Sequence, residues 1–330
     1  KPVPTPIPLP ATPTLIAAPT PGPKELKEYM LSLINEDRRR YGLSPVVLGN
    51  NTAAQKHTEE RLANDYNSHW GMDGLTPYMR YTLAGGRNYE AENGFVSRTT
   101  WIGGKDPFYK RDPKEMLAEA EKSLMASPGH RENILNKWHK IVNIGIAYNN
   151  ESLHLVQQFE GDYVEFSKKP TVSAGILSFA GKLKGGFTLE GVGIWYDQPP
   201  HPLTLGQLDA TYAYLTGQQP ATFLREPLTG GSYYPDSSTR FTWEPGLDPY
   251  SLDPNTPRRP SPPLLTFRTK SKVVPWTTAS IWRVSGQSFE IQADISLVLN
   301  QLGPGVYTVT IWGTAQGESV PLTDYSIFVE

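Results

Sequence analysis

The sequence predicts an α+β chain whose first folded half mixes helices with strands and whose second half is built from strands. Between residues 26 and 165, apolar residues first recur at helical spacing and then form strand-like runs. From about 170 to 330, short alternating or β-branched runs are separated by Gly and Pro turns. We therefore expect a Pro-rich stalk or linker at 1–25, a first domain at 26–168 and a β-sandwich domain at 169–330.

Composition bounds the possible functions. The 330 residues suit about two domains, and a net charge of −2 provides no field for steering nucleic acid. The absence of cysteine excludes disulfides, zinc-thiolate sites, iron–sulfur clusters and thiol nucleophiles. No apolar run reaches the roughly 18 residues of a membrane-spanning helix.

The first 25 residues contain nine prolines among small and apolar residues. Such a segment favours extended polyproline II, so it is either a semi-rigid spacer or a tail with no role. Because the chain begins at Lys1, we expect that a signal peptide, lipid anchor or upstream helix precedes it in the full protein.

Helix signals dominate the start of the first domain. Apolar residues at 26, 29, 30, 33 and 34 form one helix face, which Gly42 can end. A second helix is expected near Asn51, and Pro113 and Pro128 each stand at a first helical position. The runs 141–148 and 153–159 then predict an antiparallel hairpin.

The second domain is expected to be one immunoglobulin-like sandwich. Its strand signals lie at 187–196, 280–284, 288–295, 306–312 and 325–329. The Pro- and Gly-rich stretch 225–263 predicts a long irregular excursion over the sandwich or the domain boundary.

Several motifs of the first domain resemble, in order, those of the bacterial CAP superfamily, also called SCP or PR-1-like. They cover residues 26–165, so the resemblance predicts a CAP-type three-layer α-β-α sandwich there. The motifs are Asn35-Glu36-x-Arg38 with Tyr41-Gly42-Leu43, Ser68-His69, Asp73-Gly74-Leu75-Thr76-Pro77-Tyr78-Met79-Arg80, Ala91-Glu92-Asn93-Gly94, Ser127-Pro128-Gly129-His130-Arg131-Glu132-Asn133-Ile134-Leu135, Ile144-Gly145-Ile146-Ala147 and Gln157-x-Phe159.

The resemblance also implies a cleft in which two histidines and acidic residues converge. By position these are His69, His130 and Glu92, and they would carry any catalysis. The second glutamate of the family's eukaryotic members falls on Ser127, so Glu121 or Glu119 would have to replace it.

Such a cluster suits either of two chemistries. Imidazole and carboxylate groups can bind a divalent metal such as zinc, with His69, His130 and Glu92 as ligands and Glu121 as a further candidate. They can equally form a hydrogen-bonded acid–base cluster. The 61-residue separation of the histidines does not decide between them.

Other residues of reactive type have simpler expected roles. Ser127 suits a helix N-cap, and Ser68 lies beside His69 without a third group to complete a triad. Arg80 is expected to anchor the cleft loop by a salt bridge. The remaining histidines are expected to be structural or on the surface: His57, His139, His154 and His201.

Aromatic residues gather in two places. Those of residues 66–110 either bind a glycan or peptide at the cleft or cover a loop-rich face: Trp70, Tyr78, Tyr81, Tyr89, Trp101, Phe108 and Tyr109. Those within strand runs of the second domain are expected in its core: Trp195, Trp282 and Trp312.

Two functions remain open from the sequence. The first is a non-enzymatic extracellular binding or adhesion module for a polymer, peptide or lipid. The alternative is a metal-dependent, peptidase-like hydrolase that uses the same cleft. The resemblance, the stalk and the lack of cysteine together favour a prokaryotic protein exported to the envelope or the exterior.

Overall fold

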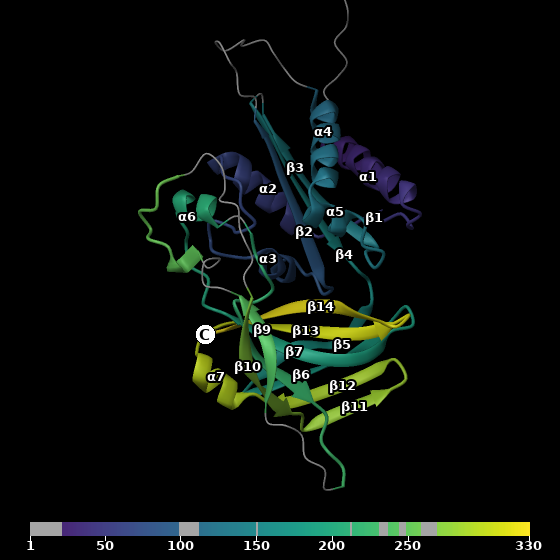
Figure 1. Ribbon diagram of the computed structural model, residues 1–330, viewed down its shortest axis with the longest axis vertical. Coiled ribbons are helices and arrows are strands. Elements are labelled where there is room, and N and C mark those ends of the chain that lie inside the picture. The colour runs from purple at the N-terminus through teal and green to yellow at the C-terminus, as the bar shows by residue number, and fades with distance from the viewer. Residues whose placement is uncertain are drawn as a thin grey trace, which may run out of the picture.

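The computed structural model describes residues 22–98, 112–149, 151–211, 213–230, 237–243, 249–258 and 269–330. Two domains are stacked along the long axis of the molecule, with the helices gathered in the upper one and most strands in the lower one (Figure 1). Nearly all of the expected stalk, Trp101, Phe108 and Tyr109 lie outside the described residues. No helix in the described ranges is both long and apolar enough to cross a membrane.

Proline starts most helices of the first domain, because its fixed φ suits the first helical position and its missing N–H costs nothing there. Four of the five helices carry Pro at their first turn. At the end of the first helix, Gly42 takes a φ of 70°, the left-handed conformation expected of a C-terminal glycine. The helices are α1 Pro23–Arg40, α2 Ala53–Asn64, α3 Pro77–Leu83, α4 Pro113–Ala126 and α5 Pro128–Ile134.

The first domain has the three layers that the sequence predicts. Its sheet has the order β1-β3-β4-β2, with strands β1 Val47–Leu48, β2 Glu90–Arg98, β3 Ile141–Tyr148 and β4 Ser152–Glu160. The β3–β4 hairpin is confirmed. Apolar residues of β3 and β4 pack with α1 and α4 on one face, and α2 packs on the other face. Gly145 of β3 permits this close approach, since a Cβ there would lie 2.2 Å from the Ala54 carbonyl oxygen of α2.

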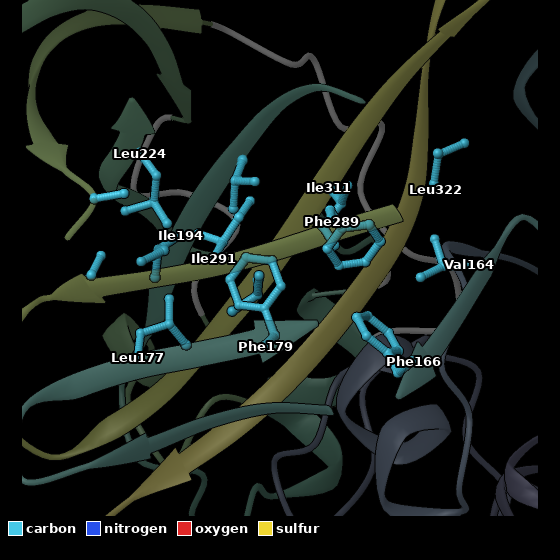
Figure 2. Close-up of a cluster of buried hydrophobic side chains, with 14 of the residues drawn as sticks. Val164, Phe166, Leu177, Phe179, Ile194, Leu224, Phe289, Ile291, Ile311 and Leu322 are labelled. Carbon is cyan, nitrogen blue, oxygen red and sulfur yellow. The ribbon is translucent and has the colours of Figure 1, made fainter. Parts of the chain in front are cut away.

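The second domain is a sandwich of two sheets. The larger has the order β14-β13-β7-β8-β10-β9 and the smaller the order β11-β12-β6-β5. Figure 2 shows apolar side chains of both sheets meeting in one core, among them Phe179, Ile291 and Ile311. The strands are β5 Val164–Ser173, β6 Ile176–Leu183, β7 Thr188–Asp197, β8 Gln219–Arg225, β9 Ser237–Trp243, β10 Thr269–Thr278, β11 Ile281–Ser285, β12 Ser288–Asp294, β13 Gly305–Ala315 and β14 Glu318–Val329.

Three features of this domain differ from the sequence-based expectation. The sandwich begins with β5 at Val164, a few residues before the expected boundary. Two short helices, α6 Leu205–Ala210 and α7 Ser296–Leu302, interrupt the strands. The excursion 225–263 is not wholly irregular, because β9 lies within it and pairs with β10. Short elements of this kind carry too few residues for periodicity to reveal them.

The two domains are joined by more than the chain connection at 161–163. The N–H of Tyr89 donates to the Leu322 carbonyl of β14 at 2.9 Å, and Thr323 Oγ1 donates to the Arg87 carbonyl at 2.6 Å. Residues of the β7–β8 segment (198–211 and 213–218) form a second contact, where Leu203 and Leu208 pack against Tyr66 and Trp70. The 3₁₀ helix η2, Pro249–Ser251, completes this contact, as expected for part of the excursion.

Candidate functional site

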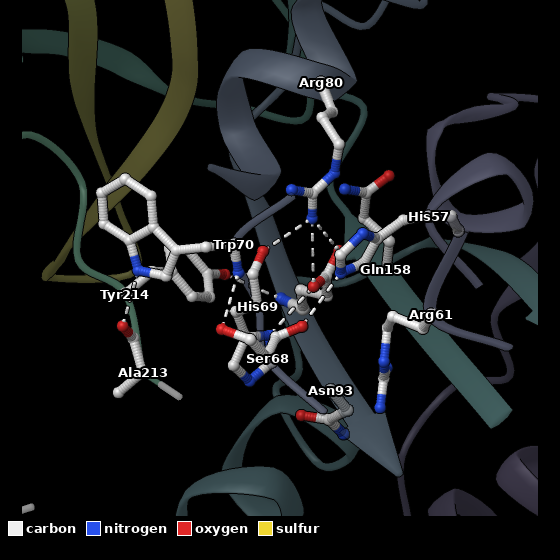
Figure 3. Close-up of polar contacts among 12 residues, drawn as sticks. His57, Arg61, Ser68, His69, Trp70, Arg80, Asn93, Gln158, Ala213 and Tyr214 are labelled. Carbon is white, nitrogen blue, oxygen red and sulfur yellow. Dashed lines mark hydrogen bonds and ion pairs between the residues drawn. The ribbon is translucent and has the colours of Figure 1, made fainter. Parts of the chain in front are cut away.

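A histidine–glutamate pair forms the centre of the candidate site. His69 lies in the loop between α2 and α3, and Glu92 lies on β2. The His69 Nδ1 and Glu92 Oε1 atoms are 2.9 Å apart (Figure 3). The two residues are only 6% and 3% exposed, so the pair that the sequence predicted does converge but is almost shielded from solvent.

Arg80 of α3 holds this pair in place. Its guanidinium donates to the Leu75 carbonyl at 2.6 Å and to the His69 carbonyl at 2.9 Å. It also reaches the Glu92 carboxylate at 3.4 Å. The expected role of Arg80 as the anchor of the cleft loop is therefore confirmed.

The charge of Glu92 is stabilised despite its burial. Burial alone would raise the pKa of this carboxyl, but the Arg80 guanidinium and the hydrogen bond with His69 outweigh it and lower the pKa to about 2. Glu92 is thus a fixed anion over the physiological pH range.

The second domain closes the site. Tyr214 of the β7–β8 segment accepts a hydrogen bond from the Glu92 N–H at 3.0 Å, and its ring centre lies 5.1 Å from that of His69. Next to it, Ser68 Oγ donates to the Thr211 carbonyl and Trp70 Nε1 donates to the Ala213 carbonyl. Figure 3 shows Tyr214 and Ala213 on the Trp70 side of the pair. These covering contacts join residues that are 122 to 143 positions apart, and no local pattern predicts them.

A second carboxylate lies beside the pair. Glu90 lies two residues before Glu92 on the same face of β2, and the Tyr214 hydroxyl donates to Glu90 Oε1 at 3.4 Å. Burial, reinforced by the charges of Glu92 and Asp324, raises the pKa of Glu90 well above its usual range. Burial likewise raises the pKa of Asp324 on β14 to about 7. Nothing in their local sequence distinguishes these two acids from surface carboxylates, so the sequence does not predict them.

His130, the second predicted cleft histidine, is half-buried on α5. Its carbonyl accepts a hydrogen bond from Asn93 of β2 at 3.0 Å. Burial, and then the nearby charge of His69, lower the pKa of His130 to about 4, so the imidazole is neutral at pH 7. The two imidazoles are therefore close enough to interact electrostatically.

Glu121 is buried in α4 and reaches the site only indirectly. Its Oε2 accepts a hydrogen bond from Gln157 Nε2 at 2.6 Å, and Gln157 Oε1 accepts one from Asn93 at 3.1 Å. Its Oε1 is buried without a hydrogen-bond partner. Burial raises its pKa to about 8, so this carboxyl is mostly protonated at pH 7. Glu119, the other candidate replacement, is exposed on the same helix.

These residues do not fit a three-ligand metal site. Glu92 already binds His69 and the permanent cation of Arg80, and Glu121 reaches the site only through Gln157 and Asn93. Within the described ranges, no three His, Asp or Glu side chains are grouped closely enough to hold a metal ion. The geometry instead matches the hydrogen-bonded cluster that was the alternative.

The serines and the other histidines are engaged in structural contacts. Ser68 Oγ donates to Thr211 and accepts from the Trp70 N–H, so it is not oriented as a nucleophile. Ser127 occupies the N-cap position of α5, although its hydroxyl makes no capping bond. His57 Nε2 donates to the Ser68 carbonyl at 3.0 Å, and burial, with the charge of Arg80, lowers the pKa of His57 well below its usual range. His139 and His154 are buried and His201 is exposed.

The aromatic residues of the two domains have different outcomes. Trp70, Tyr78 and Tyr81 are buried, which matches the second of their two expected roles, covering a face rather than lining an open cleft. Conversely, Trp195 and Trp312 are half-exposed and lie on the outer face of the larger sheet. Trp282 does pack against the core, but it too is only partly buried.

Comparison with known proteins gives a match for the first domain. Residues 31–159 match the family model CAP, described as the Cysteine-rich secretory protein family, although this chain has no cysteine. None of the curated proteins matches.

Two solved structures are similar to parts of the chain. An extracellular protein containing a SCP domain from Bacillus anthracis str. Ames is 20% identical, with 44% of this chain and 45% of that chain covered and a TM-score of 0.33. An outer surface protein from Borrelia burgdorferi is 17% identical, with 42% of this chain and 93% of that chain covered and a TM-score of 0.31. This chain thus spans less than half the length of the first of these structures.

Proposed function

Because residues 31–159 form a CAP domain whose histidine–glutamate pair is covered by a second domain, we propose that this protein is a non-enzymatic binding or adhesion module exported from a prokaryotic cell. In this proposal the CAP domain is a rigid platform, the sandwich presents a binding surface, and the Pro-rich segment holds both away from an anchoring layer. The ligand belongs to the polymers, peptides or lipids found outside the cell.

One observation carries the proposal. Tyr214 is hydrogen-bonded to the Glu92 N–H and its ring lies against His69, where a substrate would have to approach. A general base must reach the proton that it abstracts, either directly or through one water. A pair that is 6% and 3% exposed offers no room for a peptide or ester beside it.

The alternative hydrolase receives less support from the same residues. A hydrolytic metal centre needs about three protein ligands and an open position for water. Here Arg80 competes for the Glu92 carboxylate, and the hydroxyl of Ser68 is already engaged with Thr211.

The test compares binding and turnover in the same full-length chain. We would measure its retention on insoluble bacterial cell-wall fractions, and its turnover of quenched-fluorescent peptides and p-nitrophenyl esters with and without zinc. His130→Ala is the informative variant, because the half-buried position tolerates truncation better than His69 does. The proposal expects equal wall binding by wild type and variant and no zinc-dependent turnover; turnover that is lost in His130→Ala would establish the hydrolase instead.

A further inference from the structure

An aromatic groove lies on the second domain, away from the histidine–glutamate pair. Its volume is about 820 Å³, within the range of ligand-binding sites. Half of the eight tryptophans of the chain line it, together with one phenylalanine: Trp195, Phe223, Trp276, Trp282 and Trp312. All five are half-exposed, and a cluster of large aromatic side chains that solvent reaches is uncommon on a protein that has no partner for it.

Four of these rings form a continuous platform on the outer face of the larger sheet, and Trp282 lies on β11 of the smaller sheet. Phe223 lies at the centre, and the ring centres of Trp195, Trp276 and Trp312 are each 6.0 Å from it. These residues lie on the adjacent strands β13, β7, β8 and β10. Four strands span about 14 Å at ordinary sheet spacing, so the platform is long enough for a chain of several rings.

Two glycines shape the floor of the groove. At Gly193, a Cβ would lie 2.8 Å from the Trp312 ring and 2.9 Å from the Phe223 ring. Only glycine therefore allows these two rings to pack directly against the backbone of β7. At Gly191, no atom lies within 4 Å of the position that a Cβ would take. The groove is therefore open above Gly191 and walled by aromatic rings beside it.

Polar groups of both signs surround the platform. Two carboxylates, Glu190 and Glu226, and one guanidinium, Arg225, line the groove with the hydroxyl of Ser319. This lining carries a net charge of −1, which disfavours an anionic polymer. It also supplies hydrogen-bond donors and acceptors, which a purely apolar lipid chain would leave unpaired.

We infer that this groove binds a neutral glycan chain. The C–H faces of sugar rings stack against aromatic planes, whose faces carry partial negative charge, and the hydroxyl edges of the sugars reach the polar rim. Ring size, polar rim, length and charge all match this ligand class. The inference does not depend on the CAP cleft and stands whether or not that cleft is enzymatic.

The test is calorimetric titration of the full-length chain with neutral hexasaccharides of glucose, N-acetylglucosamine, mannose and xylose, and with a galacturonic acid hexamer as the anionic control. Saturable binding of at least one neutral hexasaccharide is expected. Gly191→Leu should weaken it at least about tenfold by filling the groove without removing a ring. Trp312→Ala should have an effect of similar size by removing a stacking surface.

Gly129→Leu is the matched control, because no atom lies near that glycine either and it belongs to the first domain. It should bind like the wild type. The inference is overturned if no neutral hexasaccharide binds, if the anionic hexamer binds better, or if Gly129→Leu rather than Gly191→Leu lowers affinity. Absence of all saccharide binding would leave a protein partner as the occupant of the same rings.

Discussion

Replacing Glu121 by glutamine should remove one component of the pH dependence of stability, the loss of stability that this group causes between about pH 5 and pH 8. The pKa of this carboxyl rises from 4.5 to about 8 in the folded chain because α4 buries it. The folded state therefore holds a proton that the unfolded state releases, and the stability from this group is complete below pH 4.5 and is lost as the pH rises through about 8.

The size of the effect follows from that shift. Each unit of pKa corresponds to about 1.4 kcal/mol, so 4.5 to about 8 amounts to at most about 5 kcal/mol. Glu121→Gln keeps an oxygen for Gln157 Nε2 and cannot ionise. At pH 5 the variant and the wild type should therefore unfold at similar urea concentrations, whereas at pH 9 the variant should be more stable by several kcal/mol.

Urea unfolding followed by circular dichroism at pH 5, 7 and 9 measures this difference. Glu119→Gln is the matched control, since Glu119 is exposed on the same helix and should change stability by no more than about 0.5 kcal/mol at any pH. Parallel pH curves for wild type and Glu121→Gln would refute the reasoning, because they would mean that Glu121 is ionised in the folded chain at pH 7.

Three further predictions concern the covered pair. Arg80→Leu leaves the Glu92 carboxylate buried and unpaired, so thermal unfolding at pH 7 should show a loss of about 3–5 kcal/mol, and a loss below 1 kcal/mol would contradict the ion pair. Tyr214→Phe removes the acceptor of the Glu92 N–H, which should cost about 1–3 kcal/mol and speed amide exchange at that position; unchanged exchange would mean that the contact does not form. In zinc titrations by calorimetry, the wild type and the His69→Ala/His130→Ala double variant should behave alike, and a sub-micromolar site lost in the double variant would show that the pair rearranges to bind metal.

The layers of the first domain could be predicted because local signals fix them. Pro113 and Pro128 start helices at their expected positions, and the hairpin of β3 and β4 has the expected strands. Of the site, the motifs correctly paired His69 with Glu92 and assigned Arg80 as an anchor. Each of these depends on short-range patterns or on motif order.

The remainder depends on contacts between distant segments. Tyr214 lies between two strands of the other domain, and no feature of its neighbours in sequence indicates that it reaches Glu92. Trp195 and Trp312 have the strand context of core residues, yet the alternation of β7 and β13 directs them to the outer face. A tryptophan in a strand run does not reveal which face of the sheet packs on the core. The face on which these tryptophans lie determines where the groove forms.

The backbone contact between Tyr89 and β14 shields an edge of the larger sheet. β14 is an edge strand of the larger sheet, and residues 87–89 of the first domain occupy part of its outer rim. Unpaired edge strands recruit other strands and drive self-association. A sandwich separated from the first domain would expose this edge of β14 together with the apolar surface around Leu203 and Leu208. The sandwich produced alone is therefore expected to self-associate, whereas the first domain shields these surfaces when both are in one chain.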